Sequence, residues 1–261
     1  MISVIIPTHN EEDAIRRALR ALGRACGEFE VIVVDGESSD RTQARVQECI
    51  AQFPHPLRFI AAPLHRALQL NAGAREARGD VLLFLHADVV FPCQGIEALE
   101  RVLQPPAVVG GNFDLAFEGL SSWSRLFTFV NRLRRRFGIY YGDSGVFVRR
   151  EVFERLGGFR PIPIMDDYEF VRRLERTGKT ALLPSRLVVS DRRWRVQGVW
   201  RTMWSWFWVQ ALYSLGGPPR FLVRWYRPVR ATTSPPSSGP DEISPLVSPS
   251  GSVVHGAQHG T

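Results

Sequence analysis

The sequence has almost no lysine. Lys179 is the only one, although the 261 residues include 33 basic side chains and carry a formal net charge of +7. Arginine therefore carries nearly all of the positive charge, and its planar guanidinium group pairs well with phosphate and carboxylate. This excess favours an anionic partner, a class that includes a nucleotide diphosphate, a lipid head group and nucleic acid. A bias toward arginine also arises from genome composition alone, so charge does not choose among these partners.

Cysteine is scarce as well. Cys26, Cys49 and Cys93 are odd in number, widely spaced and without a paired-thiol motif. This pattern argues against a disulfide framework and a cysteine zinc site, and it fits a reducing cytoplasm. The N-terminus also lacks the basic and apolar regions of a signal peptide, so we expect a protein that is not secreted.

Long hydrophobic runs are missing. The strongest candidate for a membrane segment is Val199–Leu215, which is rich in Trp and Phe. It contains Arg201 and Gln210, and these polar residues argue against a helix that spans the membrane. Core packing and a helix at the membrane interface both remain open, because Trp beside Arg suits the head-group boundary. Arg132 and Arg134–Arg136 would assist binding to anionic lipid, although such runs are also common on solvated surfaces. We favour the interface.

Aromatic residues become rare near the end of the chain. Ser, Pro, Gly and Thr dominate residues 231–261, and such a composition cannot bury enough apolar surface to order a chain. We therefore expect a disordered tail, in which His255 and His259 are not ligands. The chain as a whole is 44% hydrophobic and 23% charged, as in ordinary globular proteins, and is long enough for one α/β domain.

Strand and helix patterns alternate in the N-terminal third of the sequence. Ser3–Pro7 and Val31–Val34 are apolar, β-branched runs, and each precedes a polar loop and a segment with helical apolar spacing. Leu57–Ile60 and Val81–Leu85 continue this pattern around a helix at Leu68–Ala77. Asn10 is expected to cap the first helix. The alternation predicts a Rossmann-like α/β fold, whose mixed, mostly parallel sheet carries helices on both faces.

Polar residues gather where the predicted strands end. Thr8–Glu11 follow the first strand, Asp35 and Gly36 follow the second, and His86–Asp88 follow the fourth. Ligands of open α/β sheets bind outside the carboxyl ends of the strands. We therefore expect a ligand site in residues 1–91. Asp88 there could hold Mg²⁺ or Mn²⁺ against a diphosphate or simply form a turn, and His86 would face the same side if the strand continued.

The pattern loosens over residues 92–196, which we expect to hold the second substrate. Val108–Phe117 and Gly145–Val148 are predicted strands, and Asp167–Arg176 is a predicted helix. Asp166 and Asp167 could cap this helix, or one of them could be a general base within reach of an acceptor hydroxyl. Asp143 precedes a strand, where it could contact a sugar or form a plain turn.

Four segments resemble those of the family 2 glycosyltransferases, which have the glycosyltransferase A fold. The segments are Ser3–Glu11, Val33–Thr42, Phe84–Asp88 and Met165–Glu169, and the resemblance covers roughly Ile2–Arg227. With Arg66–Ala74 added, the sequence is most similar to the branch whose genes are called selenoprotein- and radical-SAM-associated transferases.

The resemblance implies a role for each motif. Asp88 matches the metal-binding last position of the Asp-x-Asp motif, and Asp167 matches the catalytic base. In an inverting transfer this base would deprotonate the acceptor hydroxyl, while Mn²⁺ or Mg²⁺ and arginine would stabilise the leaving diphosphate. The residues implied in nucleotide binding are Pro7, Thr8, Asn10, Glu11, Asp35, Gly36, Arg66, His86 and Arg193. Those that would contact the sugar or the acceptor are Asp143 and Trp194.

The sequence departs from the family pattern at two positions. His86 replaces the first Asp of Asp-x-Asp, which leaves the ribose contact and the metal open. Ser190 replaces the Gln of the Gln-x-x-Arg-Trp motif of processive members, although Arg193 and Trp194 remain. Transfer of a single sugar is therefore favoured over polymer synthesis. Arg192 and Arg193 could reach the diphosphate or belong to a solvated basic cluster.

Together these features predict a metal-dependent, inverting glycosyltransferase in the cytoplasm or on the inner face of the cell membrane. It would use a UDP-sugar or a similar donor and a small or lipid-linked acceptor. The domain would span residues 1–230, with a Trp-rich helical segment at 197–230. A non-catalytic nucleotide-sugar-binding protein and an Arg-rich nucleic-acid binder are the alternatives. Asp35, Asp88 and Asp167 argue against the first, and no nucleic-acid-binding signature supports the second.

Overall fold

The computed structural model describes residues 1–117, 122–189 and 199–222. These residues belong to one compact unit, Met1–Ala231. The predicted tail and four residues with predicted or alternative roles, Ser190, Arg192, Arg193 and Trp194, lie outside the described residues. The domain boundaries expected from the sequence therefore stay predictions.

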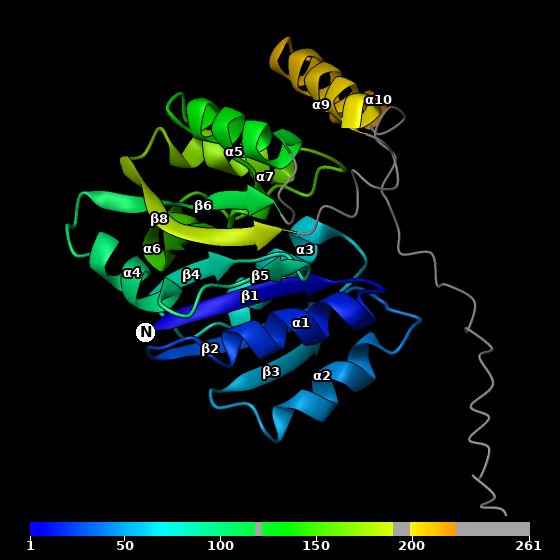
Figure 1. Cartoon of the computed structure of the whole chain (residues 1–261), viewed down its shortest axis with the longest axis vertical. Coiled ribbons are helices and arrows are strands. Elements are labelled where there is room, and N and C mark those ends of the chain that lie inside the picture. Colours follow the sequence, from blue (N-terminus) through cyan, green and yellow to red (C-terminus); the bar gives the residue numbers. More distant parts are fainter. Residues whose placement is uncertain (118–121, 190–198, 223–261) are drawn as a thin grey trace, which may run out of the picture. The chain divides into compact units, whose positions relative to one another are not determined.

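The described residues form one eight-stranded sheet with the order β3-β2-β1-β4-β7-β6-β8-β5 (Figure 1). Its strands are β1 (Ile2–Thr8), β2 (Phe29–Asp35), β3 (Leu57–Ala61), β4 (Val81–Phe84), β5 (Val89–Val90), β6 (Val108–Phe117), β7 (Val146–Arg149) and β8 (Lys179–Val189). Strands β1 to β4 run parallel, β7 is antiparallel to β4 and β6, and β8 is parallel to β6 but antiparallel to β5. The predicted mixed, mostly parallel sheet is confirmed.

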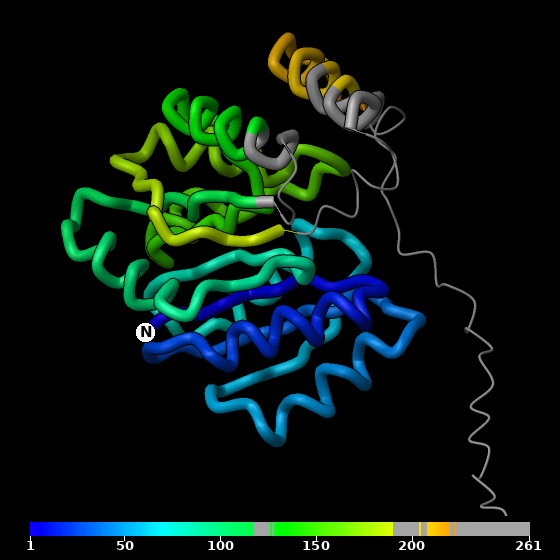
Figure 2. Tube along the Cα trace, viewed as in Figure 1, coloured from blue at the N-terminus to red at the C-terminus, as the bar shows by residue number. Residues whose placement is uncertain are grey.

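Helices cover both faces of this sheet, as the tube view also shows (Figure 2). They are α1 (Glu12–Leu22), α2 (Thr42–Ile50), α3 (Arg66–Glu76), α4 (Gly95–Val102), α5 (Ser122–Arg135), α6 (Arg150–Arg155), α7 (Asp166–Leu174), α9 (Val199–Ser214) and α10 (Pro219–Leu222), with a 3₁₀ turn, η1 (Gly142–Ser144). Among the described residues, no helix is both long and apolar enough to cross a membrane.

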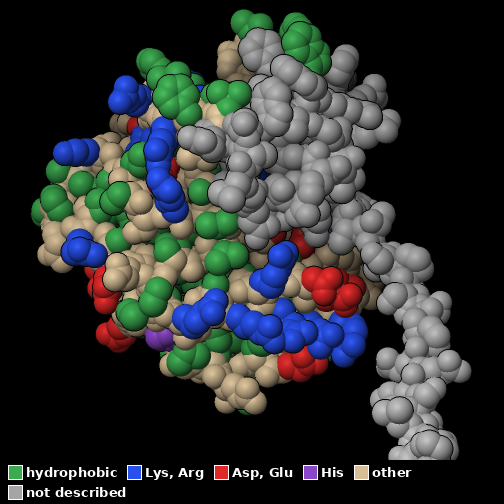
Figure 3. Space-filling model, in the orientation of Figure 1, with side chains coloured by type: hydrophobic (Ala, Val, Ile, Leu, Met, Phe, Trp, Pro, Cys, Tyr) green, Lys and Arg blue, Asp and Glu red, His purple; other side chains and the backbone are tan. Residues whose placement is uncertain are grey.

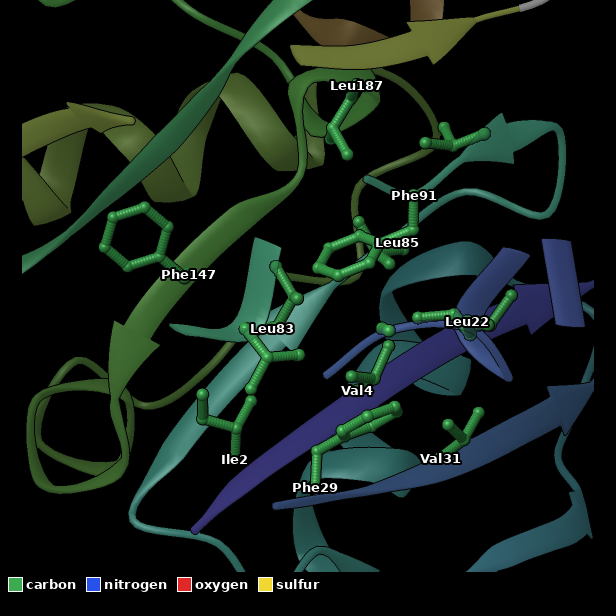
Figure 4. Packing of buried hydrophobic residues seen from close by; sticks show 14 of the residues in the cluster. Ile2, Val4, Leu22, Phe29, Val31, Leu83, Leu85, Phe91, Phe147 and Leu187 are labelled. Atoms are coloured by element: carbon green, nitrogen blue, oxygen red, sulfur yellow. The ribbon is translucent and has the colours of Figure 1, made fainter. Parts of the chain in front are cut away.

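The alternation of side chains along β1 divides the core between the two faces. Val4 packs in a cluster with residues of α1, α2 and α4, which includes Leu22, Phe29 and Leu83 (Figure 4). Its neighbour Ile5 packs on the other face with residues of α3, α6 and α7. Helices on both faces, as predicted, leave the carboxyl ends of the parallel strands as the edge where loops meet.

The predicted elements agree with the observed ones to within a few residues, with one consequential exception. β4 ends at Phe84, and Ala87 and Asp88 form a turn that leads into β5. The strand therefore does not continue to Asp88, so the condition under which His86 and Asp88 would face the same side is not met. A short turn, which reverses the chain toward β8, sets their directions instead.

Candidate active site

The register of the sheet brings the ends of the first two strands together. Thr8, the last residue of β1, pairs with Asp35, the last residue of β2. On the other side of β1, Ile5 pairs with Phe84 at the end of β4. The loops that follow these strands therefore leave the sheet at one edge, as the sequence predicted, and this edge is where an α/β sheet binds its ligand.

Three hydrogen bonds hold the side chain of Asp35. The hydroxyl of Thr8 donates to Oδ1 at 3.1 Å, the hydroxyl of Ser38 donates to the same oxygen at 2.5 Å, and the backbone N–H of Ser38 donates to Oδ2 at 2.9 Å. The residue is only 7% exposed. A buried carboxylate with such partners keeps one orientation, so Asp35 is a fixed acceptor at the end of β2.

Asn10 joins the first loop to the second. Its backbone has a φ of 56°, a left-handed conformation that asparagine tolerates better than most residues. The side-chain oxygen of Asn10 accepts hydrogen bonds from the backbone N–H groups of Ser39 at 2.8 Å and Asp40 at 3.4 Å. The prediction that Asn10 caps α1 is wrong, because Glu11 occupies the N-cap position and makes no side-chain capping bond.

Gln69, in α3, is a structural residue that sequence reasoning missed. Its buried side-chain amide donates to the carbonyl oxygens of Thr8 at 2.8 Å and Val34 at 2.9 Å. A Cβ atom on Gly36 would lie 2.8 Å from this amide nitrogen, which is why glycine follows Asp35. The available signal was a glutamine at a buried position of a predicted helix, within the segment Arg66–Ala74.

A second cluster forms where α3 and α7 begin, around the guanidinium group of Arg66. Its Nε donates to Asp166 Oδ2 at 3.1 Å, and its Nη2 pairs with Asp166 Oδ1. The same Nη2 lies 3.2 Å from Asp167 Oδ1, and Nη1 lies 3.5 Å from Nε2 of His86. Residues far apart in sequence, such as Arg66 and Asp166 at a separation of 100 positions, therefore meet on one guanidinium group.

Asp167 is held by backbone groups as well as by charge. Its Oδ2 accepts the N–H of Gly142 and its Oδ1 accepts the N–H of Tyr168, both at 2.8 Å. Burial acts to raise the pKa of Asp167, but Arg66 and these two N–H groups hold the pKa below its usual value. Asp167 is therefore ionised at neutral pH and is able to accept a proton.

Asp166 differs from its neighbour in its partners. It is buried and forms the fork-shaped pair with Arg66, whereas Met165 is the N-cap residue of α7 and makes no side-chain capping bond. Neither Asp166 nor Asp167 therefore occupies the N-cap position of α7. Asp166 contributes charge to the first turn of α7 and anchors Arg66, which leaves Asp167 as the carboxylate with the weaker hold on that guanidinium group.

His86 lies against the same cluster. Burial, followed by the charge of Arg66, lowers the pKa of its imidazole, and the carboxylates of Asp88, Asp167 and Asp166 oppose this effect. The imidazole is therefore neutral at neutral pH. Gly142 packs so closely that an added Cβ would lie 3.1 Å both from His86 Nε2 and from Asp167 Oδ2. His86 thus lies beside Asp167 and belongs to the cluster around Arg66.

Asp88 is half-buried at the turn after β4. Within the ranges that the structure describes, no three His, Cys, Asp or Glu side chains form a group that could hold a metal ion. Mg²⁺ and similar ions, however, are often bound through one or two carboxylates together with substrate phosphates. Asp88, with His86 beside it, fits an ion that a diphosphate helps to coordinate.

Asp143 lies in η1, next to the Gly142 that contacts Asp167. It lines a small cavity together with Tyr141 and with residues of β6 and α5. The cavity, with a volume of about 20 Å³, has room for a water molecule. A contact between Asp143 and substrate stays a prediction.

Helix α9 packs against α7 and against the segment just before η1, through contacts that the sequence did not indicate. The hydroxyl of Tyr141 donates to Gln210, and the rings of Tyr168 and Tyr213 are 5.9 Å apart. Val209 of α9 is buried in the same cluster. Trp204 and Trp208 remain 65% and 42% exposed. Part of this segment therefore packs in a core, and the interfacial alternative for its exposed part stays a prediction.

Comparisons with known proteins bear on the family and the fold of this chain. A family model described as Glycosyl transferase family 2 matches residues 3–157. A dolichol-phosphate mannosyltransferase from Pyrococcus furiosus is 32% identical over 163 residues, covering 60% of this chain and 45% of that protein. An undecaprenyl-phosphate 4-deoxy-4-formamido-L-arabinose transferase from Pseudomonas paraeruginosa is 32% identical over 163 residues, covering 57% and 46%. The chain thus spans about half the length of these curated relatives.

Two solved structures have a similar fold. The mannosyltransferase PcManGT from Pyrobaculum calidifontis, in complex with GDP-Man and Mn²⁺, is 25% identical with a TM-score of 0.63, and the match covers 86% of this chain and 67% of that one. S. aureus TarS 1–349, in complex with UDP-GlcNAc, is 18% identical with a TM-score of 0.61, covering 73% and 58%. The second likeness concerns the fold alone.

Proposed function

Because the chain belongs to glycosyl transferase family 2, we propose that it is a metal-dependent, inverting glycosyltransferase. It moves a single sugar from a nucleotide-diphosphate sugar to the hydroxyl of a small or lipid-linked acceptor. The observation that carries this proposal is the contact of Arg66 with Asp166, Asp167 and His86, at the sheet edge where Asp35 also lies.

The nucleotide binds at the ends of β1 and β2. Asp35 accepts hydrogen bonds from the base or the ribose, because its oxygens are fixed by Thr8 and Ser38. Pro7, Asn10, Glu11 and Gly36 shape the walls of this site together with Thr8. The sequence resemblance favours a uridine nucleotide, whereas the similar structure at 25% identity contains GDP-Man.

Asp88 would hold the divalent cation, Mn²⁺ or Mg²⁺, against the diphosphate, and His86 would be a nitrogen ligand or a neighbour of that site. When bound, this cation supplies positive charge that offsets the charge of the leaving diphosphate. Arg66 adds a positive charge from the side of α3. A guanidinium group shared among two carboxylates and an imidazole is well placed to turn toward a phosphate that enters the site.

Asp167 takes the proton from the acceptor hydroxyl. Its lowered pKa keeps the carboxylate ionised, and the same interactions make it a weak base in the free protein. When Arg66 turns toward the diphosphate, one cause of the lowered pKa is removed, and Asp167 becomes a stronger base as the donor binds. The backbone N–H groups of Gly142 and Tyr168 keep its orientation throughout.

The acceptor enters from the side of α9 and α5. Leu126, Phe129 and Leu133 of α5 and Phe137 just beyond it are exposed and spaced three or four residues apart, and Phe137 is 75% exposed. Side chains of this kind gather over α5 beside basic ones (Figure 3). The relatives are named for dolichol-phosphate and undecaprenyl-phosphate acceptors. An apolar helix face flanked by arginine suits an anionic membrane that presents such an acceptor.

Only part of the basic cluster expected at Arg134–Arg136 is available for binding to anionic lipid. Arg135 points inward to Asn112, Glu175 and Thr180. Arg136 is exposed and remains available for lipid head groups. Co-sedimentation with vesicles of anionic phospholipid tests the surface, because the double variant Phe129→Ser, Phe137→Ser should bind less than the wild type. Equal binding of the two proteins would remove α5 from the interface.

The function itself is tested by incubating the protein with UDP-, GDP- and dTDP-sugars and Mn²⁺, while thermal stability and release of nucleoside diphosphate are followed together. A donor that binds the native state raises its stability, and turnover should accompany binding. Stabilisation without any release of diphosphate, in the presence of polyprenyl-phosphate acceptors, would favour the non-catalytic binding protein.

A further inference from the structure

Two exposed cysteines, Cys26 and Cys93, lie side by side although 67 positions separate them in sequence, and their sulfur atoms are 3.7 Å apart. Cys26 lies between α1 and β2, and Cys93 lies between β5 and α4. Cys26 comes shortly before Phe29, where β2 begins, whereas Asp35 ends the same strand. At about 3.3 Å per residue the pair is roughly 20 Å from the candidate active site.

The backbone holds the two cysteines in this position. The N–H of Cys26 donates to the carbonyl oxygen of Cys93 at 2.9 Å, and the thiol of Cys93 donates to the carbonyl oxygen of Arg24 at the same distance. Gly27 has a φ of 119°, and a Cβ there would lie 2.6 Å from the side chain of Ile96 at the start of α4. The proximity of the sulfur atoms therefore follows from the packing of two loops.

We propose that Cys26 and Cys93 form a thiol pair that a low-molecular-weight disulfide, such as glutathione disulfide, oxidises to an intrachain disulfide. The sulfur atoms need to approach by roughly 1.7 Å to reach the disulfide bond length of about 2.05 Å. Both side chains are exposed, so rotation about their own bonds supplies part of this movement and the oxidant has access. The sequence spacing gave no sign of the pair, because the fold alone brings the two loops together.

The reaction proceeds by two thiol–disulfide exchanges. One cysteine, as its thiolate, attacks a sulfur of glutathione disulfide, which forms a mixed disulfide and releases one glutathione thiolate. The second cysteine loses its proton to solvent and attacks the protein-bound sulfur of the mixed disulfide. This step forms the Cys26–Cys93 bond and releases the second glutathione. Two protein thiols are oxidised and one glutathione disulfide is reduced.

The neighbouring thiol also sets the pH dependence of the first exchange. Hydrogen bonding and charge from Cys93 raise the pKa of Cys26. Because only the thiolate attacks, oxidation should accelerate as the pH rises toward the pKa. Cys49, the third cysteine, is half-buried, and burial raises its pKa. It therefore serves as the matched control within the same chain.

The test uses the full chain, incubated with glutathione disulfide at mildly alkaline pH and then denatured without reductant. Free-thiol titration and peptide mass mapping should show that two of the three thiols are lost and that Cys26 is joined to Cys93. Cys49→Ser should form the same bond. Cys93→Ser should instead retain one glutathione on Cys26, since no second thiol is present to displace it.

The bond should also stabilise the fold, because it closes a long loop that contains β2, α2, β3, α3, β4 and β5. Restriction of the unfolded chain should raise the melting temperature by roughly 5 °C or more, and reductant should reverse the shift. Nucleotide binding should not change, so this test fails or succeeds independently of the proposed function. Retention of glutathione on both cysteines, or a bond that involves Cys49, would overturn the proposal.

Discussion

The ends of β1 and β2 and the cluster around Arg66 lie at the same edge of the sheet, but different forces hold them. Thr8, Ser38 and Gln69 tie the strand ends together mainly through hydrogen bonds to backbone groups and to the single carboxylate of Asp35. One guanidinium group holds the other cluster against two carboxylates. Under the proposed function, the first region would be preformed for the nucleotide. The second would change on binding, because a diphosphate would compete with the two carboxylates for the same guanidinium group.

We expect the largest loss of turnover from a substitution at Asp167. Asp167→Asn keeps the size and much of the hydrogen bonding but cannot accept a proton, so turnover should fall by roughly 10²–10⁴-fold. The affinity for donor should not fall, because Asp167 acts on the acceptor hydroxyl and its carboxylate competes with the diphosphate for Arg66. Steady-state kinetics with Asp166→Asn as the control check the assignment. If Asp166→Asn costs more turnover with an intact fold, its neighbour is not the base.

Asp88 should produce a smaller loss of a different kind. Asp88→Asn weakens coordination of the cation, so donor binding and turnover should decline together by about 10- to 100-fold. Excess Mn²⁺ should restore part of both. Titration of activity with Mn²⁺ measures the effect, and a loss of turnover at unchanged metal affinity would place Asp88 outside the metal site.

A substitution at Arg66 tests whether charge holds this cluster together, because the effect of the substitution on stability should then depend on pH. Arg66 lowers the pKa of Asp167 in the folded protein, so this contribution to stability is present above the unfolded pKa and is lost as the pH falls through the folded one. Arg66→Gln should therefore reduce stability at neutral pH by about 1–2 kcal/mol, after allowance for the partial exposure of Arg66.

Arg66→Gln should also shift the acid limb of the pH profile of kcat/KM to higher pH, because Asp167 binds a proton more readily when Arg66 is absent. Arg66→Lys should retain part of the shift in pKa but not the fork-shaped pair with Asp166. Melting temperatures and pH–rate profiles of both variants test this. A stability difference that does not narrow in acid would show that Arg66 acts through packing rather than charge.

The smallest effect is expected at Gln69. Gln69→Ala removes two hydrogen bonds to Thr8 and Val34, which contribute about 1 kcal/mol in total after exchange with water. Thermal unfolding should show this loss together with a slight weakening of UDP binding. Normal pH dependence of kcat/KM is the control, since the Arg66 cluster is untouched. A shifted pH profile would mean that the two regions are coupled.

The sequence predicted the layers of the fold well because the strands are short, apolar and separated by helices with regular spacing. It also predicted which residues follow the strand ends. It failed at Asn10 and at the turn before Asp88, where local backbone conformation, not periodicity, decides the direction of a side chain. Tyr141 and Gln210 were missed because they meet only through tertiary packing. The proximity of Cys26 and Cys93 was missed for the same reason.

The measurement that tests the account most directly is calorimetric titration of UDP with Mn²⁺ into three proteins: the wild type, Asp35→Asn and Asp167→Asn. The account predicts that Asp35→Asn loses most of the affinity, because a fixed acceptor for the nucleotide is replaced, while Asp167→Asn binds nearly as well as the wild type. All three should first be matched by their melting temperatures. Loss of UDP binding in Asp167→Asn that equals the loss in Asp35→Asn would contradict the division of this edge into a nucleotide region and a chemical one.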